Sequence, residues 1–120
     1  MALADREFPD PPYYAVIFVS HRTDDDHGYA ATAERMVQLA AEQPGFLGVD
    51  SARDPAESGG LGITVSYWRD ERAIEEWRRH AEHTLARETG RERWYEEFDV
   101  HVTRVTRRYG FRRPSSQSGQ

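Results

Sequence analysis

Hydrophobic and polar positions along the chain fall into segments with two different periods. Residues 14–21 form a continuous apolar and β-branched run, which is typical of a central strand buried on both faces. Apolar residues then recur at spacings of three and four from residue 27 to residue 42, and this pattern predicts an amphipathic helix. Residues 46–53 predict a second strand nearer a sheet edge. Residues 61–68 alternate between two sets of side chains, which predicts a third strand paired with the second as a hairpin.

A second helix is expected after Asp70, whose carboxylate can accept hydrogen bonds from the free amides of a first helical turn. His80, His83 and Arg87 follow one border of its apolar face, while most of its charged residues lie on the opposite, solvent side. Gly90 is the expected end of this helix, because glycine most easily adopts the left-handed conformation found there. The apolar face itself consists of Ile74, Trp77, Ala81, Thr84 and Leu85.

The last strand is expected from about residue 97 to residue 109. Phe98, Val100 and Val102 alternate, and the apolar phase then moves to Val105, which predicts a bulge or a strong bend. The order strand, helix, strand, strand, helix, strand predicts a ferredoxin-like α+β fold, βαββαβ, with helices on one side of an antiparallel sheet. The predicted domain covers residues 13–111. Residues 1–12 are expected to be a flexible lead-in and residues 112–120 a disordered tail.

Composition narrows the possible functions. The 120 residues suit one domain, and the formal net charge of −5 provides no general basic field that would attract nucleic acid. The chain has no cysteine and no lysine, which excludes disulfides, thiol nucleophiles and Schiff-base chemistry. No apolar run approaches the roughly 20 residues of a membrane-spanning helix. We therefore expect a cytoplasmic protein that binds neither nucleic acid nor a membrane.

Candidate chemistry gathers around the second helix. In a functional interpretation, Trp68 and Trp77 hold a flat small molecule between helix and sheet, while Arg87 and a histidine polarise or deprotonate one of its oxygens. In a structural interpretation the tryptophans belong to the core, His80 is a hydrogen-bonded boundary residue, and Arg87 forms a surface ion pair. His21, at the end of the first strand, either completes the pocket or is an ordinary strand-end histidine. Both interpretations stay open.

Metal binding is a third interpretation. His80 and His83 are three residues apart, whereas helical zinc ligands usually lie four apart. Glu76 could join His80 at a spacing of four. The run of acidic residues at 24–26 is more typical of a solvated helix start than of a calcium loop. No nucleophile elbow and no phosphate-binding glycine loop occur in the sequence.

Several motifs together resemble the antibiotic biosynthesis monooxygenase family over roughly residues 13–111. They are Tyr67-Trp68, Arg69-Asp70, Ala73-Ile74, Trp77, His80-x-x-His83, Gly90-Arg91 and Trp94-Tyr95, with Pro44-Gly45-Phe46-Leu47-Gly48 earlier in the chain. The resemblance implies a dimeric α/β barrel, in which two protomers pack the uncovered faces of their sheets together. We therefore expect a homodimer.

Oxygenases of this family oxidise electron-rich aromatic molecules without metal or flavin, so the resemblance implies no cofactor. Trp77 and Arg87 are counterparts of residues that act in those enzymes, and Tyr67 or Tyr95 could serve as their tyrosine. The family's asparagine has no counterpart, because the chain contains no asparagine. Haem-degrading members place a histidine ten residues after the tryptophan, where this chain has Arg87. A dimeric protein that binds a small aromatic molecule without turnover is the non-enzymatic alternative.

Overall fold

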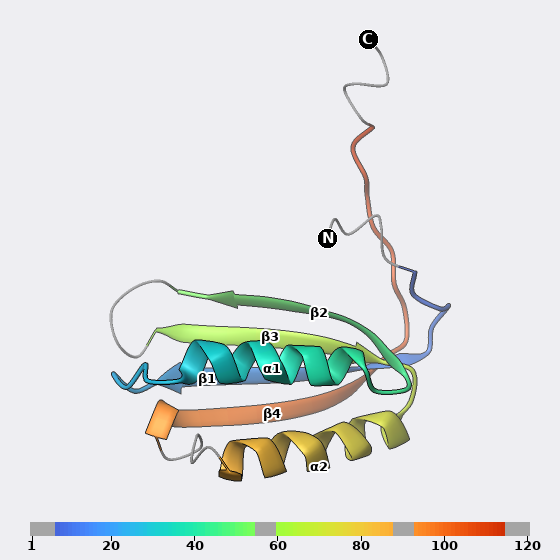
Figure 1. The fold of residues 1–120 in the computed structure, drawn as a ribbon. Coiled ribbons are helices and arrows are strands. Elements are labelled where there is room, and N and C mark those ends of the chain that lie inside the picture. Colours follow the sequence, from blue (N-terminus) through green and yellow to red (C-terminus); the bar gives the residue numbers. More distant parts are fainter. Residues whose placement is uncertain (1–6, 55–59, 88–92, 115–120) are drawn as a thin grey trace.

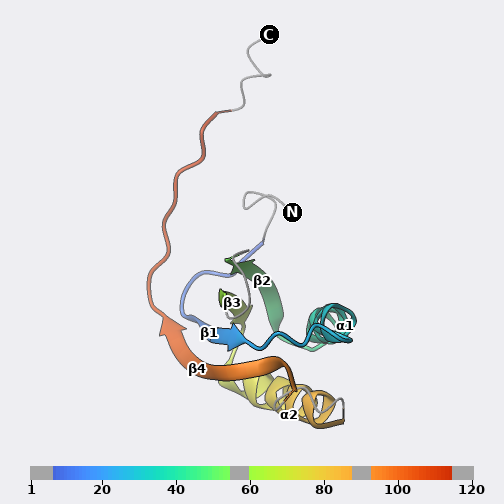
Figure 2. The same ribbon diagram turned by 90° about the vertical axis from the view of Figure 1, so that its left-hand side faces the viewer.

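The computed structural model describes residues 7–54, 60–87 and 93–114, and the side chains of residues 85–87 lie outside that description. One antiparallel sheet is covered on one side by two helices, α1 (Tyr29–Ala41) and α2 (Glu71–Arg87) (Figure 1, Figure 2). This arrangement confirms the predicted ferredoxin-like α+β fold. The strands are β1 (Tyr13–Arg22), β2 (Phe46–Arg53), β3 (Leu61–Trp68) and β4 (Tyr95–Val105).

The strand order β2-β3-β1-β4 places β1 in the middle and β2 at an edge, as predicted. Tyr14 pairs with Trp68, and Ser20 pairs with Gly62. Paired residues of antiparallel strands point to the same side of a sheet. We call the side that carries Tyr14 and Trp68 the helix face, because Trp68 packs there with Ala73 of α2, and we call the other side the open face.

Of the bulge or strong bend predicted near Val105, the bulge is absent. Pairing between β1 and β4 runs without a shift from Tyr13 opposite Val105 to His21 opposite Glu97, and its one irregularity lies at the other end, between His21 and Arg22. The apolar phase changes for a different reason. Val102 lies on the helix face, whereas Val105 lies on the open face beside Tyr13, and both faces accept apolar residues. The last strand also ends at Val105, four residues earlier than expected.

Small residues let the helices approach the sheet. The buried core consists of Ala40, Trp68, Ala73 and Ile74, with Tyr14, Val16, Phe46 and Trp77 packed around it. The amide of Ala73 donates to Asp70 Oδ1 at 2.9 Å, which confirms the predicted helix cap. Gly45 has a φ of 89°, and a Cβ there would lie 2.8 Å from that of Ala73. Only glycine fits this turn after α1. The predicted end of α2 at Gly90 lies outside the described residues.

The open face and the C-terminal segment leave apolar groups exposed. Leu61 and Ile63 on the open face are both exposed. After β4, residues 106–114 extend away from the sheet (Figure 1), and their Tyr109 and Phe111 side chains are largely exposed. At one end of the open face, Phe8 packs against Tyr67. None of the helices in the described ranges has the length and apolar character needed to cross a membrane.

Candidate functional site

The two histidines of α2 lie on the surface of the molecule. His80 and His83 are exposed, and they line an open depression of about 330 Å³ together with Glu76 and Arg79. Their rings therefore face a solvated environment rather than a space between helix and sheet. The predicted side chain of Arg87 lies outside the described residues. The catalytic roles predicted for these residues stay predictions.

The described part of the chain contains no group of three His, Asp or Glu side chains arranged to hold a metal ion. Glu76 and His80 border the same depression, but no third ligand joins them among these residues. Of the acidic run at 24–26, Asp25 and Asp26 form ion pairs with Arg93 and Arg22. This run therefore acts in loop packing.

The two candidate tryptophans pack against each other. Trp68 is 0% exposed, its ring lies 6.2 Å from that of Trp77, and the two ring planes are 23° apart. Trp68 Nε1 donates to Ser66 Oγ at 2.9 Å, and Phe46 meets the Trp68 ring edge to face. The indole of Trp68 has no exposed surface for a ligand, which supports the structural interpretation of this residue.

Two other candidates lie on the open face, away from the helices. Tyr67 precedes Trp68 on β3 and points to the opposite side, where its hydroxyl donates to Asp50 Oδ2 at 3.2 Å. His21 pairs with Leu61 on the same open face, and its Nδ1 lies 3.0 Å from Glu97 Oε2. Because alternate residues of a strand face opposite sides, neither residue can line a pocket between helix and sheet with Trp68. The predicted common pocket is therefore wrong for Tyr67 and His21.

Tyr95 is a predicted site residue on the helix face, near the start of α1. It pairs with Arg22 at the start of β4, and its ring lies 6.2 Å from that of Tyr29 at the start of α1. Phe18 and Phe98 meet the Tyr95 ring at 5.6 and 5.5 Å. Burial and then the interaction with Tyr29 raise the pKa of Tyr95 well above its ordinary value. Tyr95 therefore stays a neutral phenol at neutral pH, beside the ring of Tyr29.

An arginine crosses the sheet beside this tyrosine pair. Arg53, Gly62 and Ser20 form one row of paired residues across β2, β3 and β1 on the helix face. Arg53 Nη2 donates to Ser20 Oγ at 2.8 Å, and Nη1 donates to the Gly60 carbonyl at 2.7 Å. A Cβ on Gly62 would lie 2.3 Å from the Arg53 guanidinium carbon. Glycine at position 62 therefore makes the space through which Arg53 reaches β1.

A second arginine, Arg22 of β1, stacks on the ring of Tyr29. The guanidinium carbon of Arg22 lies 3.4 Å from the centre of the Tyr29 ring, which is a cation–π contact. Arg22 Nη2 also donates to the Asp25 carbonyl at 2.9 Å and to Asp26 Oδ1 at 3.0 Å. The Arg22 side chain is 12% exposed, and its Nε has no hydrogen-bond partner among the described residues.

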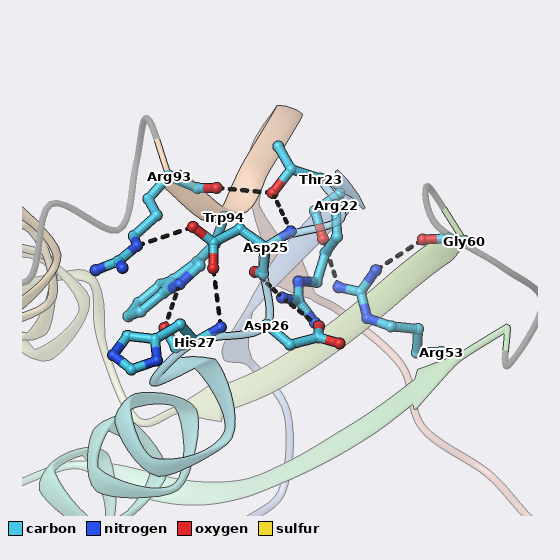
Figure 3. A network of polar contacts seen from close by, with 10 residues as sticks. Arg22, Thr23, Asp25, Asp26, His27, Arg53, Gly60, Arg93 and Trp94 are labelled. Carbon is cyan, nitrogen blue, oxygen red and sulfur yellow. Dashed lines mark hydrogen bonds and ion pairs between the residues drawn. The ribbon is translucent and has the colours of Figure 1, made fainter.

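A network of polar contacts fixes the start of α1 onto the start of β4 (Figure 3). Asp25 accepts from the His27 amide at 2.9 Å and from Arg93 Nε at 2.9 Å. Trp94 Nε1 donates to the His27 carbonyl at 2.9 Å, and Thr23 Oγ1 donates to the Arg93 carbonyl at 2.7 Å. The hydrogen bond from His27 and then the contact with Arg93 hold the pKa of Asp25 below its ordinary value. This loop clamp, residues 23–27 with 93 and 94, brings Tyr29 to Tyr95.

An apolar strip lies beside the tyrosine pair on the edge strand. Val100 pairs with Phe18 and Val102 pairs with Val16, so both valines belong to the helix face. They are nevertheless 50% and 52% exposed. The helix face therefore offers an uncovered apolar surface next to aromatic rings and phenol donors, an arrangement that can bind a flat molecule carrying oxygen.

The sequence contained a signal for the residues that we missed. Phe18, Ser20 and Arg22 occupy alternate positions of the first strand, so they share the face of Tyr14 and Val16. The uninterrupted apolar run of residues 14–21, which contains Phe18 and Ser20, conceals this alternation. The contributions of Tyr29 and Arg53 depend on the pairing of distant segments, and no local pattern indicates them.

Comparison with known proteins assigns the family. Residues 12–89 match the family described as antibiotic biosynthesis monooxygenase. The chain is 59% identical over 99 residues to the uncharacterised protein YqjZ of Bacillus subtilis, covering 82% of this chain and 84% of that protein. The chain belongs to the antibiotic biosynthesis monooxygenase family.

More distant proteins share the fold. The chain is 29% identical over 94 residues to the jasmonate monooxygenase ABM of Pyricularia oryzae, which covers 78% of this chain and 43% of that protein. The structure resembles that of SnoaB, a cofactor-independent oxygenase from Streptomyces nogalater, with a TM-score of 0.58 and 16% identity over 89% of this chain and 100% of that chain. The PA3566 protein of Pseudomonas aeruginosa gives a TM-score of 0.60 and 19% identity over 85% and 100% of the two chains.

Proposed function

We propose that this chain is a cofactor-independent monooxygenase that acts on an electron-rich aromatic or polyketide-like small molecule. The observation that carries the proposal is its membership of the antibiotic biosynthesis monooxygenase family over residues 12–89. Two proteins named as a monooxygenase and an oxygenase, from Pyricularia oryzae and Streptomyces nogalater, support the reaction class.

The proposed reaction draws all its electrons from the substrate. A ring CH₂ or phenol that loses a proton gives a delocalised carbanion or enolate, which can react directly with dioxygen. One oxygen atom then becomes a carbonyl of the product, and the other leaves as water, so that CH₂ and O₂ give C=O and H₂O. The protein has to hold the substrate away from bulk water and stabilise the negative oxygen that develops on it.

The helix face provides groups suited to both tasks. The strip of Val100 and Val102 next to Phe18 gives an apolar surface for a ring system. Tyr29 lies beside Tyr95 at the start of α1, and its hydroxyl is a group that can donate a hydrogen bond to an oxyanion. We assign oxyanion stabilisation to Tyr29 and its positioning to Tyr95. His80 and His83 are exposed, so we leave them outside this assignment.

The proposed enzyme is a homodimer. Leu61 and Ile63 are exposed on the open face, and an apolar sheet face of this kind is normally covered by another element. The C-terminal segment adds exposed Tyr109 and Phe111. It also carries four of the 16 basic residues and no acidic residue between positions 106 and 114. A basic aromatic segment that leaves an otherwise acidic protomer is suited to bind a second copy.

A dioxygen-uptake screen tests the activity. Purified protein is mixed with hydroquinones, anthrones and related phenols, and oxygen consumption and product mass are followed together. We expect uptake that depends on protein and a product that has gained one oxygen atom and lost two hydrogen atoms, without added metal, flavin or haem. Haem titration serves as the control for the haem-degrading branch of the family. Absence of uptake above the uncatalysed rate across the screen would contradict the proposal.

A non-enzymatic dimeric binding protein is the second candidate. It is favoured by one observation, namely that His21, His80 and His83, the predicted histidines, all lie away from the space between the sheet and the helices. Binding of the same phenols without oxygen uptake would support this candidate over the enzyme.

A further inference from the structure

Arg53 contacts no carboxylate among the described residues. Both of its hydrogen bonds within the described residues go to neutral oxygens, those of Ser20 and Gly60. Ser20 is buried, and the guanidinium lies over Gly62 on the helix face, where it is partly removed from water. Placing a permanent cation in such surroundings costs free energy unless a negative group compensates it.

Arg22 adds a second positive charge to the same end of the helix face. Burial and the contact with Tyr29 raise the pKa of Tyr95, whereas the charges of Arg53 and Arg22 lower it. Arg22 pairs with Tyr95 and lies on the Tyr29 ring, and Arg53 is bonded to Ser20, the next residue of β1 on the same face as Arg22. The carboxylate that contacts Arg22 belongs to Asp26, which is largely exposed, and Asp25 is engaged by Arg93.

We infer that Arg53, with Arg22 and the Tyr29 hydroxyl beside it, binds the carboxylate or similar monoanionic group of an aromatic ligand. A guanidinium presents a fork of donors that suits a planar anion, and the phenol adds a further donor. Phe18 and Phe98, whose rings lie 5.1 Å apart, supply an aromatic wall for the ligand body. The site rests on the proposed function only where this ligand is called the substrate, since binding requires no turnover.

The experiment compares two fluorescent probes of similar shape. One is 8-anilinonaphthalene-1-sulfonate, which carries a fixed negative charge, and the other is the uncharged N-phenyl-1-naphthylamine. Dissociation constants are measured for the full chain and for Arg53→Met, Arg53→Lys and Arg79→Met. We expect Arg53→Met to weaken binding of the anionic probe by about 10- to 100-fold, because a charge-assisted hydrogen bond is lost. Binding of the uncharged probe should stay within about twofold.

The other variants control for charge and folding. Arg53→Lys keeps the charge and should retain part of the preference for the anion, while Arg79→Met removes an exposed arginine from α2 and should change neither constant. The quantity that decides is the ratio of the two constants, which a general loss of folding affects equally in both. An unchanged ratio in Arg53→Met, or no preference for the anion in the full chain, would overturn the inference.

Oxygen uptake is recorded for the same proteins. If the protein binds the anionic probe through Arg53 but consumes no oxygen, the result supports this binding site and contradicts the proposed activity. If the protein consumes oxygen but Arg53→Met leaves the ratio of the two dissociation constants unchanged, the result supports the proposed activity and contradicts this binding site.

Discussion

The indole rings of Trp68 and Trp77 stack with their centres 6.2 Å apart, one from the end of β3 and the other from the middle of α2. This contact joins the second helix to the sheet. It also occupies the position at which the sequence led us to expect a flat ligand between two tryptophans. The pair therefore supports the fold first, and its two members should differ in how much they contribute.

Truncation to alanine should destabilise the fold by different amounts at the two tryptophans. Trp68 is fully buried, so Trp68→Ala should lower the free energy of unfolding by about 3–5 kcal/mol through lost burial and a cavity. Trp77 is half-buried, and Trp77→Ala should cost about 1–3 kcal/mol. Urea unfolding at a fixed protein concentration measures both values. Equal losses, or a larger loss at Trp77, would show that the described packing of this pair is wrong.

The histidines of α2 give a second prediction. A general base usually contributes about 10²–10⁴ to the rate. Because His80 and His83 are exposed on an open depression, we expect His80→Ala and His83→Ala each to change the turnover number by less than about threefold. Steady-state oxygen uptake tests this directly. A decrease of the turnover number by a hundredfold or more at either position would show that a histidine of α2 does transfer the proton.

Much of the fold could be predicted because its signals are local. The cap at Asp70 depends on neighbouring residues alone, and it appears as expected. The phase change before Val105 was misinterpreted for a physical reason. A strand with apolar neighbours on both faces can change the face that it uses without any change of register.

The candidate site was harder to predict, because its residues come together through strand pairing. Arg53 reaches Ser20 only where Gly62 lies between them, across three strands. For residues adjacent in the sequence the error was the reverse, because we expected them to share one site. Tyr67 and Trp68 are neighbours in the sequence, and for that reason they lie on opposite faces of the sheet.

The tyrosine pair gives a third prediction. Tyr29→Phe removes the proposed oxyanion donor and should lower the turnover number by about 10²–10³, the usual effect of losing one such donor. Tyr95→Phe should have a smaller effect, since it removes only the group that positions Tyr29. The raised pKa of Tyr95 means that no loss of activity from its ionisation should appear below about pH 10. A pH–rate profile of both variants checks the order, and a larger effect of Tyr95→Phe would reverse the assigned roles.

The loop clamp gives a prediction about acid stability. The folded pKa of Asp25 lies below its ordinary value of 3.8, so its carboxylate stabilises the fold above that pH. This contribution is lost as the pH falls below 3.8 through the folded value. Asp25→Asn should therefore lower Tm at neutral pH, and its difference from the unmodified chain should shrink toward about pH 3.

Asp24 supplies a matched control for the clamp. It is exposed next to Asp25, so Asp24→Asn should leave Tm nearly unchanged over the same pH range. A difference between Asp25→Asn and the unmodified chain that stays constant down to the lowest pH would show that the charge of Asp25 is not what stabilises the loop.

Dimerisation gives the last prediction. Obligate interfaces bury upward of about 2,000 Å², and a charge placed at the centre of such an apolar face is left unpaired. Ile63→Asp should therefore convert the protein to a monomer at micromolar concentration, as measured by light scattering. Val37→Asp makes a comparable change at an exposed position of α1 and should leave the dimer intact.

The C-terminal segment should act in the same assembly. The double variant Tyr109→Ser, Phe111→Ser should therefore raise the dimer dissociation constant by at least about tenfold, because interface aromatics carry much of the binding energy. A monomeric unmodified chain, or a dimer that Ile63→Asp leaves intact, would remove the open face from the interface.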